Sequence, residues 1–182
     1  MKDNNIKQAI KDIIEHCGES TMDEQFKGTP DRVVRMYDEL LSGYDEQKWK
    51  LTTFKNPGYD EMLVETNIPF TSLCAHHFLP FVGVAHIGYM PGEKIVGLSK
   101  LARVVHQFGR RLQSQEKMGI EIANYIEEHL KPNGVIVILN SEHMCMTIRG
   151  VQAAGTRTIT SVARGAFRTN ASLKAEFLTL IK

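Results

Sequence analysis

Two short strings of Cys and His, far apart in the sequence, most constrain how this chain folds. Cys74-Ala75-His76-His77 and His143-Met144-Cys145 hold two thiols and three imidazoles of a chain that has only 3 Cys and 7 His. Thiolate sulfur and imidazole nitrogen are ligands that zinc prefers, and a zinc ion with three protein ligands keeps one position open to activate water. The strings therefore predict a fold that brings residues 74–77 and 143–145 together around a catalytic metal.

The spacing of the strings favours a catalytic site over a structural zinc module. Cys74 and His77 are three positions apart and can contact one ion from a single turn, while Cys145 must come from another element. A structural module usually closes with a second tight pair of ligands, and the sequence has none. The H-x-E and P-C-x-x-C pattern of zinc deaminases is also absent. The alternative is that Cys74 and Cys145 are buried, reduced thiols, which is common for free Cys.

Length and composition bound the class of protein. A chain of 182 residues with 42% hydrophobic content is long enough for one well-packed domain and short for two. A net charge of +1 gives no general field that attracts nucleic acid or an anionic membrane. The polar N-terminal segment lacks the apolar core of a signal peptide, and no apolar run is long enough to span a membrane. Together with an odd number of Cys, these features lead us to expect a cytoplasmic protein with no nucleic-acid or membrane partner.

Periodicity predicts an N-terminal helical region, residues 1–60, followed by a mixed α and β region, residues 61–182. Isoleucines at helical spacing predict a helix over about residues 5–16. Thr29-Pro30-Asp31 predicts the start of a second helix, with Thr29 as the N-cap and Pro in the first turn. Residues 49–60 show little periodicity, and we expect a connecting loop there.

In the second region, apolar and β-branched stretches predict strands separated by a pair of helices. The helices are expected after Ser99, taken as an N-cap, and around Met118 to Leu130, with a short final helix from Ser172. The strands are expected over residues 62–70, 81–90, 135–139, 144–148 and 156–167. The order of elements predicts an α+β fold, in which a four-stranded sheet carries a helix pair on one face. Its two open edges favour a symmetric homo-oligomer in which sheets pair edge to edge in a ring.

Basic residues near the two strings are candidates for binding phosphate. Lys100 and Arg103 lie three positions apart just after Ser99, where the N–H groups of a helix end also favour an anion. Arg149 follows Cys145 by four, and on a strand this spacing keeps both side chains on one face.

Other polar residues have ordinary explanations, and some of them have functional ones as well. Arg32, near the start of its helix, adds a fourth candidate cation, whereas we interpret Arg110 and Arg111 as solvated surface charges. Gln115-Glu116 would lie on a solvated helix face if spacing were the only criterion.

Taken in order, these residues make the chain resemble the GTP cyclohydrolase I family. The resemblance runs from Thr29 to Leu178 and includes several long, specific motifs. They are Cys74-Ala75-His76-His77-Phe78-Leu79-Pro80-Phe81, Gly97-Leu98-Ser99-Lys100-Leu101-Ala102-Arg103, Arg110-Arg111-Leu112-Gln113-Ser114-Gln115-Glu116 and His143-Met144-Cys145-Met146.

Residue by residue, the resemblance implies roles for individual side chains. Cys74, His77 and Cys145 match the zinc ligands, and His76 and His143 match two catalytic histidines. Glu116 matches the carboxylate that binds the guanine edge, with Gln115 beside it. The remaining matches are Ser99, a residue near the ribose, and the nucleotide- and triphosphate-binding positions Arg32, Leu98, Lys100, Arg103 and Arg149.

The resemblance also implies a fold, an assembly and a reaction. The family has the tunnelling fold, a four-stranded antiparallel sheet with a helix pair on one face, and forms a toroidal homodecamer of two pentamers with active sites between subunits. The implied reaction is the zinc-dependent conversion of GTP to 7,8-dihydroneopterin triphosphate and formate, the first step of pterin and folate biosynthesis. In it, His143 protonates N7 of the purine and His76 the ribose ring oxygen.

One position departs from the family pattern. Family members generally carry Glu between the Cys and the His pair, whereas this chain has Ala75. A carboxylate there can orient an imidazole or the activated water, and Glu142, next to His143, is a candidate to replace it. The alternative is a catalytically altered member of the fold, which binds a purine nucleotide without turnover or acts on a related pterin or deazapurine precursor.

Overall fold

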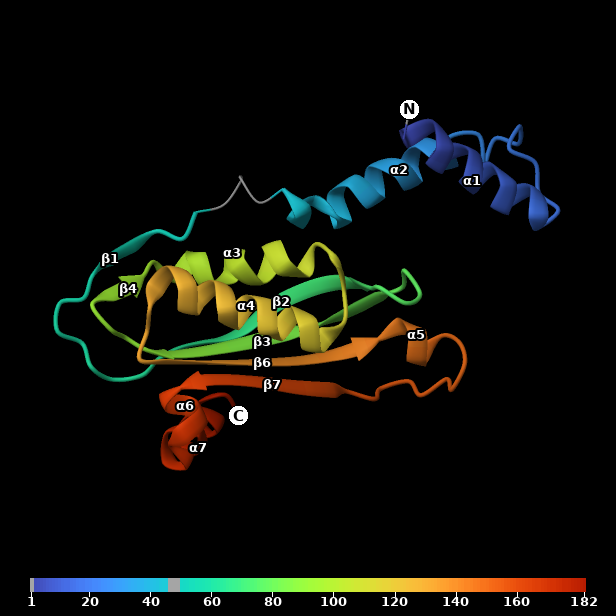
Figure 1. Cartoon of the computed structure of the whole chain (residues 1–182). Coiled ribbons are helices and arrows are strands. Elements are labelled where there is room, and N and C mark those ends of the chain that lie inside the picture. The colour runs from blue at the N-terminus through green and yellow to red at the C-terminus, as the bar shows by residue number, and fades with distance from the viewer. Residues whose placement is uncertain (1, 46–49) are drawn as a thin grey trace. The chain divides into compact units, whose positions relative to one another are not determined.

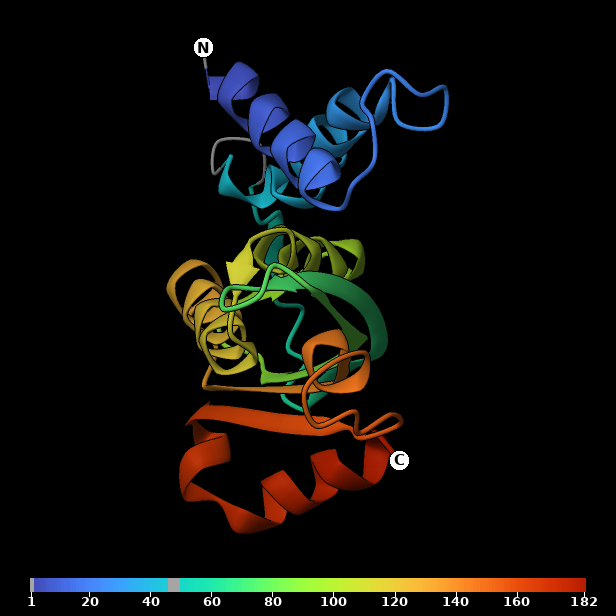
Figure 2. The ribbon, with the colours of Figure 1, turned by 90° about the vertical axis from the view of Figure 1, so that its right-hand side faces the viewer.

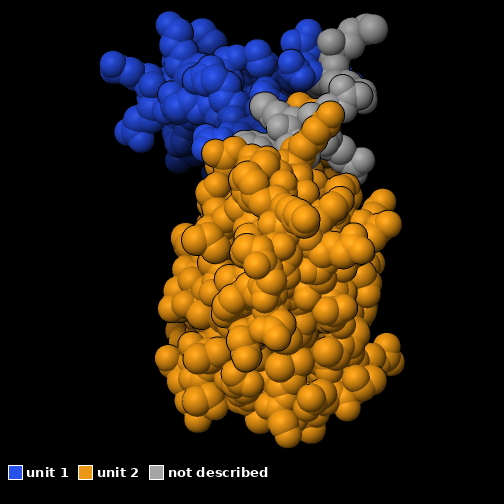
Figure 3. All heavy atoms as spheres, turned by 90° about the vertical axis from the view of Figure 1, so that its left-hand side faces the viewer, with its two compact units in different colours: residues 1–42 blue, residues 43–182 orange. Residues whose placement is uncertain are grey.

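The computed structural model describes residues 2–45 and 50–182, in two compact units (Figure 3). Unit 1 is Met1–Ser42 and unit 2 is Gly43–Lys182. A functional division between residues 1–60 and 61–182 stays a prediction.

Unit 1 is a pair of helices, α1 (Lys2–His16) and α2 (Thr29–Leu40). Ile14 and Val34 are buried, and Lys7 Nζ lies 2.6 Å from Asp31 Oδ1. Thr29 is the first residue of α2, so its prediction as the N-cap is wrong, and Gly28 takes that place without a side-chain cap. The Thr29 hydroxyl instead accepts a hydrogen bond from Arg32.

Unit 2 is built on a five-stranded sheet with the order β5-β2-β3-β6-β7. Figure 1 labels four of these strands, β2, β3, β6 and β7. The four long strands, all antiparallel, are β2 (Leu63–Cys74), β3 (Pro80–Met90), β6 (Gly134–His143) and β7 (Thr158–Gly165). The prediction of a mixed α+β fold is confirmed. The sequence did not predict β5 (Leu112–Gln113), which pairs parallel to the end of β2.

Helices cover both faces of the sheet because alternate residues of β6 are apolar on both sides. Val135, Val137 and Leu139 join the core formed with α3 (Leu98–Gly109) and α4 (Gln115–Leu130). Ile136 and Ile138 instead pack in a second cluster with Phe167 and Phe177. These two aromatic residues belong to α6 (Ala166–Thr169) and α7 (Ala171–Leu180), on the opposite side of the sheet from α3 and α4 (Figures 1 and 2).

Two local predictions are wrong, a strand over 144–148 and an N-cap at Ser99. The strand expected over 144–148 is a helical turn, α5 (Met144–Thr147), because β6 ends at His143 and its pairing with β7 ends at Ser141. Gly97, not Ser99, is the N-cap of α3, and Lys100 N–H donates to the Gly97 carbonyl.

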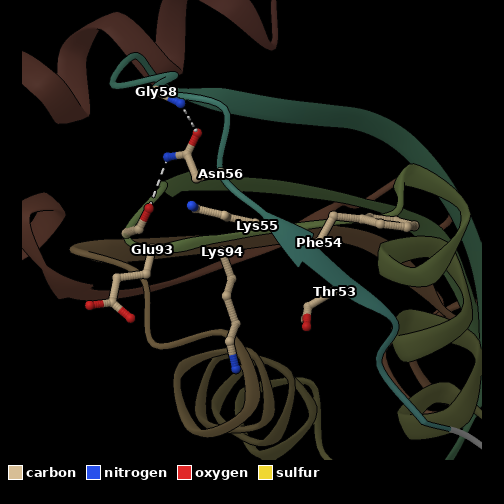
Figure 4. Close-up of a pocket in the computed structure, with 8 residues that line it drawn as sticks. Thr53, Phe54, Lys55, Asn56, Gly58, Glu93 and Lys94 are labelled. Carbon is tan, nitrogen blue, oxygen red and sulfur yellow. Dashed lines mark hydrogen bonds between the residues drawn. The ribbon is translucent and has the colours of Figure 1, made fainter.

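The loop expected over 49–60 contains a short strand. β1 (Thr53–Lys55) pairs with β4 (Lys94–Val96) in a separate two-stranded sheet, whereas residues 46–49 lie outside the described part of the chain. Figure 4 shows how Asn56 supports this ribbon: its side-chain oxygen accepts from Gly58 N–H, and its Nδ2 donates to the Gly92 carbonyl.

A hollow of about 690 Å³ lies along the β1–β4 ribbon (Figure 4). The described residues that line it include Phe54, Lys55, Glu93 and Lys94, and none of the predicted site residues. The candidate site therefore lies elsewhere in the structure.

Arg111 is buried, so its interpretation as a solvated surface charge is wrong. Its Nε donates to the Gly43 carbonyl at 2.8 Å, and its guanidinium lies 4.7 Å from the centre of the Phe108 ring. The backbone approaches closely here, since a Cβ on Gly43 would lie 1.9 Å from the Gln107 carbonyl oxygen. This contact joins the 3-10 turn at Ser42–Tyr44 to the end of α3. Arg110 is exposed, as expected.

Glu65 lies beside a bulge in β2 and is poorly accommodated as a charged group. The register with β3 shifts between Glu65 and Ile68, and Asn67 there has a positive φ of 56°. One carboxylate oxygen of Glu65 is buried and has no hydrogen-bond partner among the described residues. Burial raises the pKa of this carboxyl.

We expect Glu65→Gln to stabilise the protein at neutral pH. Burial raises the pKa of the Glu65 carboxyl in the folded protein, so the neutral carboxyl favours folding. This contribution to the free energy of unfolding is fully present below the ordinary pKa and is lost as pH rises through the raised pKa. The substitution should therefore raise the free energy of unfolding at pH 7 by about 0.5–1 kcal/mol, since partial solvent access screens part of the cost. Denaturant unfolding of both proteins across pH 4–8 measures this difference, which should vanish at the acid end. An equal difference at every pH would contradict the explanation.

Candidate active site

A tight turn after β2 positions the first string. Cys74 is the last residue of β2, and its carbonyl accepts hydrogen bonds from the N–H groups of His77 and Phe78. Phe78 closes the turn with a positive φ of 56°, and Cys74 N–H donates to the Leu79 carbonyl. The turn folds both imidazoles back over the thiol. Nδ1 of His76 and Nδ1 of His77 each lie 3.7 Å from Cys74 Sγ.

The second string meets the first across β3. His143 ends β6 opposite Phe81, and α5 then turns the chain so that Cys145 approaches Cys74. Cys74, His77 and Cys145 each offer one ligand atom, and these three atoms all lie within 4.8 Å of one another. The prediction that these three residues come together is confirmed. His76, although equally near Cys74, is not a member of this group.

The electrostatics of the two thiols fit a bound cation. Burial raises the pKa of Cys145, and the charge of Cys74 and a hydrogen bond to it raise this pKa further. Two adjacent thiolates repel each other, whereas a divalent cation between them stabilises both in the charged form. The nearby charge of Arg149 acts in the same direction, since it lowers the pKa of Cys145.

His143 is held by stacking and by a hydrogen bond. Its ring stacks on Phe81, with centroids 4.6 Å apart and an interplanar angle of 3°. Its Nε2 lies 2.9 Å from Gln115 Oε1. Burial lowers the pKa of His143, and the negative charge of Glu116 opposes this shift.

Gln115 and Glu116 begin α4 but point to different surroundings. Ser114 is the N-cap, and its hydroxyl accepts from Lys117 N–H. The Gln115 side chain is buried in a hydrogen-bond network, whereas Glu116 is exposed to the pocket that it lines.

Most of the predicted catalytic and metal-binding residues share one pocket of about 250 Å³. It is formed where the turn after β2, the end of β6 and the start of α4 meet. Its lining includes Cys74, His76, His77, Gln115, Glu116, His143 and Cys145.

The predicted phosphate-binding residues do not line this pocket. Leu98, Ser99, Lys100 and Arg103 belong to the first turns of α3. Lys100 and Arg103 border a separate small hollow together with Gln107 and Tyr125. Arg149 is exposed just after α5. Arg32 belongs to unit 1, where it also donates to the Gln25 carbonyl.

Glu142 is not among the described residues that line the pocket. It neighbours His143 on a strand, so the two side chains lie on opposite faces of the sheet. Its carboxylate accepts from the Thr147 hydroxyl and from Gly155 N–H, and it thereby orders the segment after β6. Ala75 is exposed, and its N–H donates to the Gln113 carbonyl.

Two supporting residues escaped the sequence analysis. Phe81 stacks on His143, and the Ser141 hydroxyl donates to Gln115 Oε1. Alternation along β6 places Ser141 and His143 on one face and could have indicated this relation. The contact with Phe81 depends on the register between β3 and β6, which the sequence does not reveal.

Comparisons with known proteins identify the family of the chain. The family model of GTP cyclohydrolase I matches residues 6–182. The chain is 44% identical over 186 residues to GTP cyclohydrolase 1 of Clostridium kluyveri, covering 100% of this chain and 99% of that protein. It is 46% identical over 179 residues to GTP cyclohydrolase 1 of Pelotomaculum thermopropionicum, covering 97% and 95% of the two chains.

A solved structure supports the fold. The structure described as the archaeosine synthase QueF-Like in the apo form aligns with a TM-score of 0.50 at 12% identity, covering 59% of this chain and 96% of that one. At this low identity the likeness concerns the fold alone, whereas the full-length relatives establish the family. The chain belongs to the GTP cyclohydrolase I family.

Proposed function

We propose that this protein converts GTP to 7,8-dihydroneopterin triphosphate and formate in the pocket at the end of β2 and β6. One observation carries the proposal: the Cys74, His77 and Cys145 group shares a single pocket with two further imidazoles and with Glu116. Full-length relatives named GTP cyclohydrolase 1, at 44% and 46% identity, support the same activity.

The donor set of the pocket fits zinc. Two thiolates and one imidazole are soft and borderline ligands of the kind that zinc prefers, and three protein ligands leave one position open. Bound zinc supplies Lewis acidity that activates water at neutral pH. The release of C8 of the purine as formate requires two additions of water at this carbon.

The two histidines outside the metal group are positioned to move protons. We assign to His143 the protonation of purine N7, which makes C8 electrophilic, and to His76 the protonation of the ribose ring oxygen, which opens the sugar. Stacking on Phe81 limits the rotation of His143. The reaction ends with a rearrangement of the opened ribose and ring closure, which need no redox cofactor.

Glu116 is the proposed reader of the base. The Watson–Crick edge of guanine offers N1–H and the 2-amino group as donors, and one carboxylate accepts from both. Adenine presents an acceptor at N1, which a carboxylate repels. A mismatched buried polar group costs about 1–3 kcal/mol, so ATP is expected to be a poor substrate.

We assign the triphosphate and the ribose to residues that complete the pocket in an oligomer. Lys100, Arg103, Arg149 and Arg32 are the proposed phosphate ligands, with Leu98 and Ser99 near the nucleoside. Since Lys100 and Arg103 do not line the pocket of their own chain, a neighbouring subunit is their proposed source.

The edge of the sheet supports a ring-shaped assembly. β7 is the last strand of the sheet order, so within the described residues its outer side has no strand partner, and Ile159 on it is 64% exposed. Pairing through such edges supports the proposed tunnelling-fold toroid, a homodecamer of two pentamers.

We place this enzyme in the cytoplasm. No helix within residues 2–45 and 50–182 is long and apolar enough to cross a membrane.

Purified, zinc-loaded protein incubated with GTP tests the proposal. Formate and dihydroneopterin triphosphate should appear in equal amounts, with the pterin detected by fluorescence after oxidation. Binding of GTP without formate release would instead favour a catalytically altered member of the fold, which binds a purine nucleotide without turnover. The full-length similarity to GTP cyclohydrolase 1 proteins does not support this alternative.

Ala75 provides a separate prediction. Because this side chain is exposed beside the metal group, a carboxylate there would act on its surroundings rather than bind the metal in place of an existing ligand. We expect Ala75→Glu to change turnover or zinc affinity by about 10–100-fold while the native protein is already active. Steady-state kinetics and zinc titration of both proteins measure this. Activity that appears only in the Ala75→Glu variant would mean that the native chain has lost catalysis.

A further inference from the structure

The side chain of Gln115 is the centre of a saturated hydrogen-bond network. Its Nε2 lies 3.0 Å from the Leu139 carbonyl, 3.0 Å from the Thr158 carbonyl and 3.1 Å from Thr160 Oγ1. Its Oε1 lies 2.6 Å from Ser141 Oγ and 2.9 Å from His143 Nε2. The residue is only 2% exposed. Two N–H donors and two carbonyl lone pairs are therefore all engaged within the protein.

This network determines which way the amide points. The two backbone carbonyls of Leu139 and Thr158 can only accept, so the NH₂ end must face them. A flipped amide would place its oxygen against two carbonyl oxygens in a buried site, which is unfavourable because none of the three oxygens can donate. The oxygen end of Gln115 consequently faces His143.

The orientation of the amide in turn determines the state of His143. A carbonyl oxygen accepts but does not donate, so the hydrogen bond at 2.9 Å requires a proton on His143 Nε2. In the neutral imidazole the other nitrogen, Nδ1, then carries no proton. Stacking on Phe81 holds the plane of the ring, and the bond to Gln115 holds its rotation within that plane.

We propose that Gln115 is a positioning residue that holds His143 in the Nε2–H form and makes Nδ1 the atom that exchanges a proton with the substrate. The inference rests on the proposed function and refines the role of Gln115 beside the guanine. Ser141 supports Gln115 from the side, and Glu116, the next residue, is left to contact the base.

Gln115→Met tests the proposal, because Met has a similar length and no amide. The kcat for formate release should fall about 10–100-fold, as for other supporting partners of a site. The KM for GTP and the zinc content should stay within about threefold of the native values, since the proposal gives the Gln115 side chain no contact with the base and Gln115 is not a member of the metal group. Glu116→Gln is the contrasting variant and should raise KM. A Gln115→Met variant with raised KM and native kcat would overturn the proposal.

A binding measurement separates positioning from substrate contact. In a His143→Ala background, where turnover is blocked, adding Gln115→Met should leave the Kd for GTP unchanged in equilibrium dialysis. A tenfold or greater weakening would make Gln115 a substrate ligand. Thr160→Val is the matched control: it removes one of three acceptors and leaves the two carbonyls for the two N–H groups. Its kcat should stay near the native value.

A spectroscopic measurement decides the proposal even if Gln115→Met fails to fold. Solid-state ¹⁵N NMR of the native, zinc-loaded protein with labelled histidine, assigned with His143→Asn, should show His143 protonated at Nε2 and unprotonated at Nδ1. The opposite tautomer would overturn the proposal. A native protein that releases no formate would refute the proposed function alone, because the tautomer is measured independently of turnover.

Discussion

Cys145→Ser should lose zinc and activity together. Serine is a poor zinc ligand at neutral pH, and with only Cys74 and His77 remaining the site falls below the three protein ligands of a catalytic zinc site. Metal analysis should fall from about one zinc per chain to background, and formate release from GTP should fall to background as well.

The third cysteine provides the matched control for this experiment. Cys17 is exposed at the end of α1 in unit 1, and Cys17→Ser should keep both zinc and activity. A Cys145→Ser variant with full zinc occupancy would exclude Cys145 from the metal group. If zinc were lost while formate release persisted, the metal would have no part in the chemistry.

His143→Ala should keep zinc but fail at the opening of the purine ring. Since His143 is outside the metal group, its removal leaves the three ligands intact while the proton donor to N7 is gone. General acid catalysis contributes about 10²–10⁴-fold, and formate release should fall by this factor. Zinc analysis together with single-turnover formate release measures both effects.

His76→Ala provides the comparison for this prediction. It should also keep zinc, but products of the first hydrolytic steps should accumulate, because the ribose ring no longer opens. His76 Nδ1 is as close to Cys74 Sγ as His77 Nδ1 is, so zinc analysis is the decisive control. A zinc-free His76→Ala or His143→Ala variant would mean that the ligands and the acids are assigned the wrong way round.

The sequence predicted the parts of this molecule that depend on local pattern. Periodicity located the long helices and strands, and the identity of Cys74, His77 and Cys145 predicted a shared metal group. Periodicity failed at 144–148, where apolar residues typical of a strand lie beyond the point at which β6 and β7 separate. Pairing partners, not composition, decide whether such a segment forms a strand.

The same limit applies to polar side chains. On a helical pattern alone Gln115 belongs to a solvated face, and Arg111 is one of two adjacent surface charges. Both are buried because segments distant in sequence approach them: the β6–β7 strands contact Gln115 and the Ser42–Tyr44 turn contacts Arg111. These contacts require the register and the close approach of Gly43, neither of which a local sequence pattern contains.

The register between β3 and β6 makes catalysis dependent on a residue with no side chain. Gly83 pairs with Ser141, and a Cβ at this position would lie 2.1 Å from the Asn140 carbonyl oxygen. A slip of one residue would bring Val82 or Val84 to this contact, where a branched side chain does not fit. It would also turn the side chains of β6 to the opposite face relative to β3, so that Glu142 would replace His143 over Phe81. A backbone contact that touches no substrate thus excludes the pairing error that would put a carboxylate in place of an imidazole.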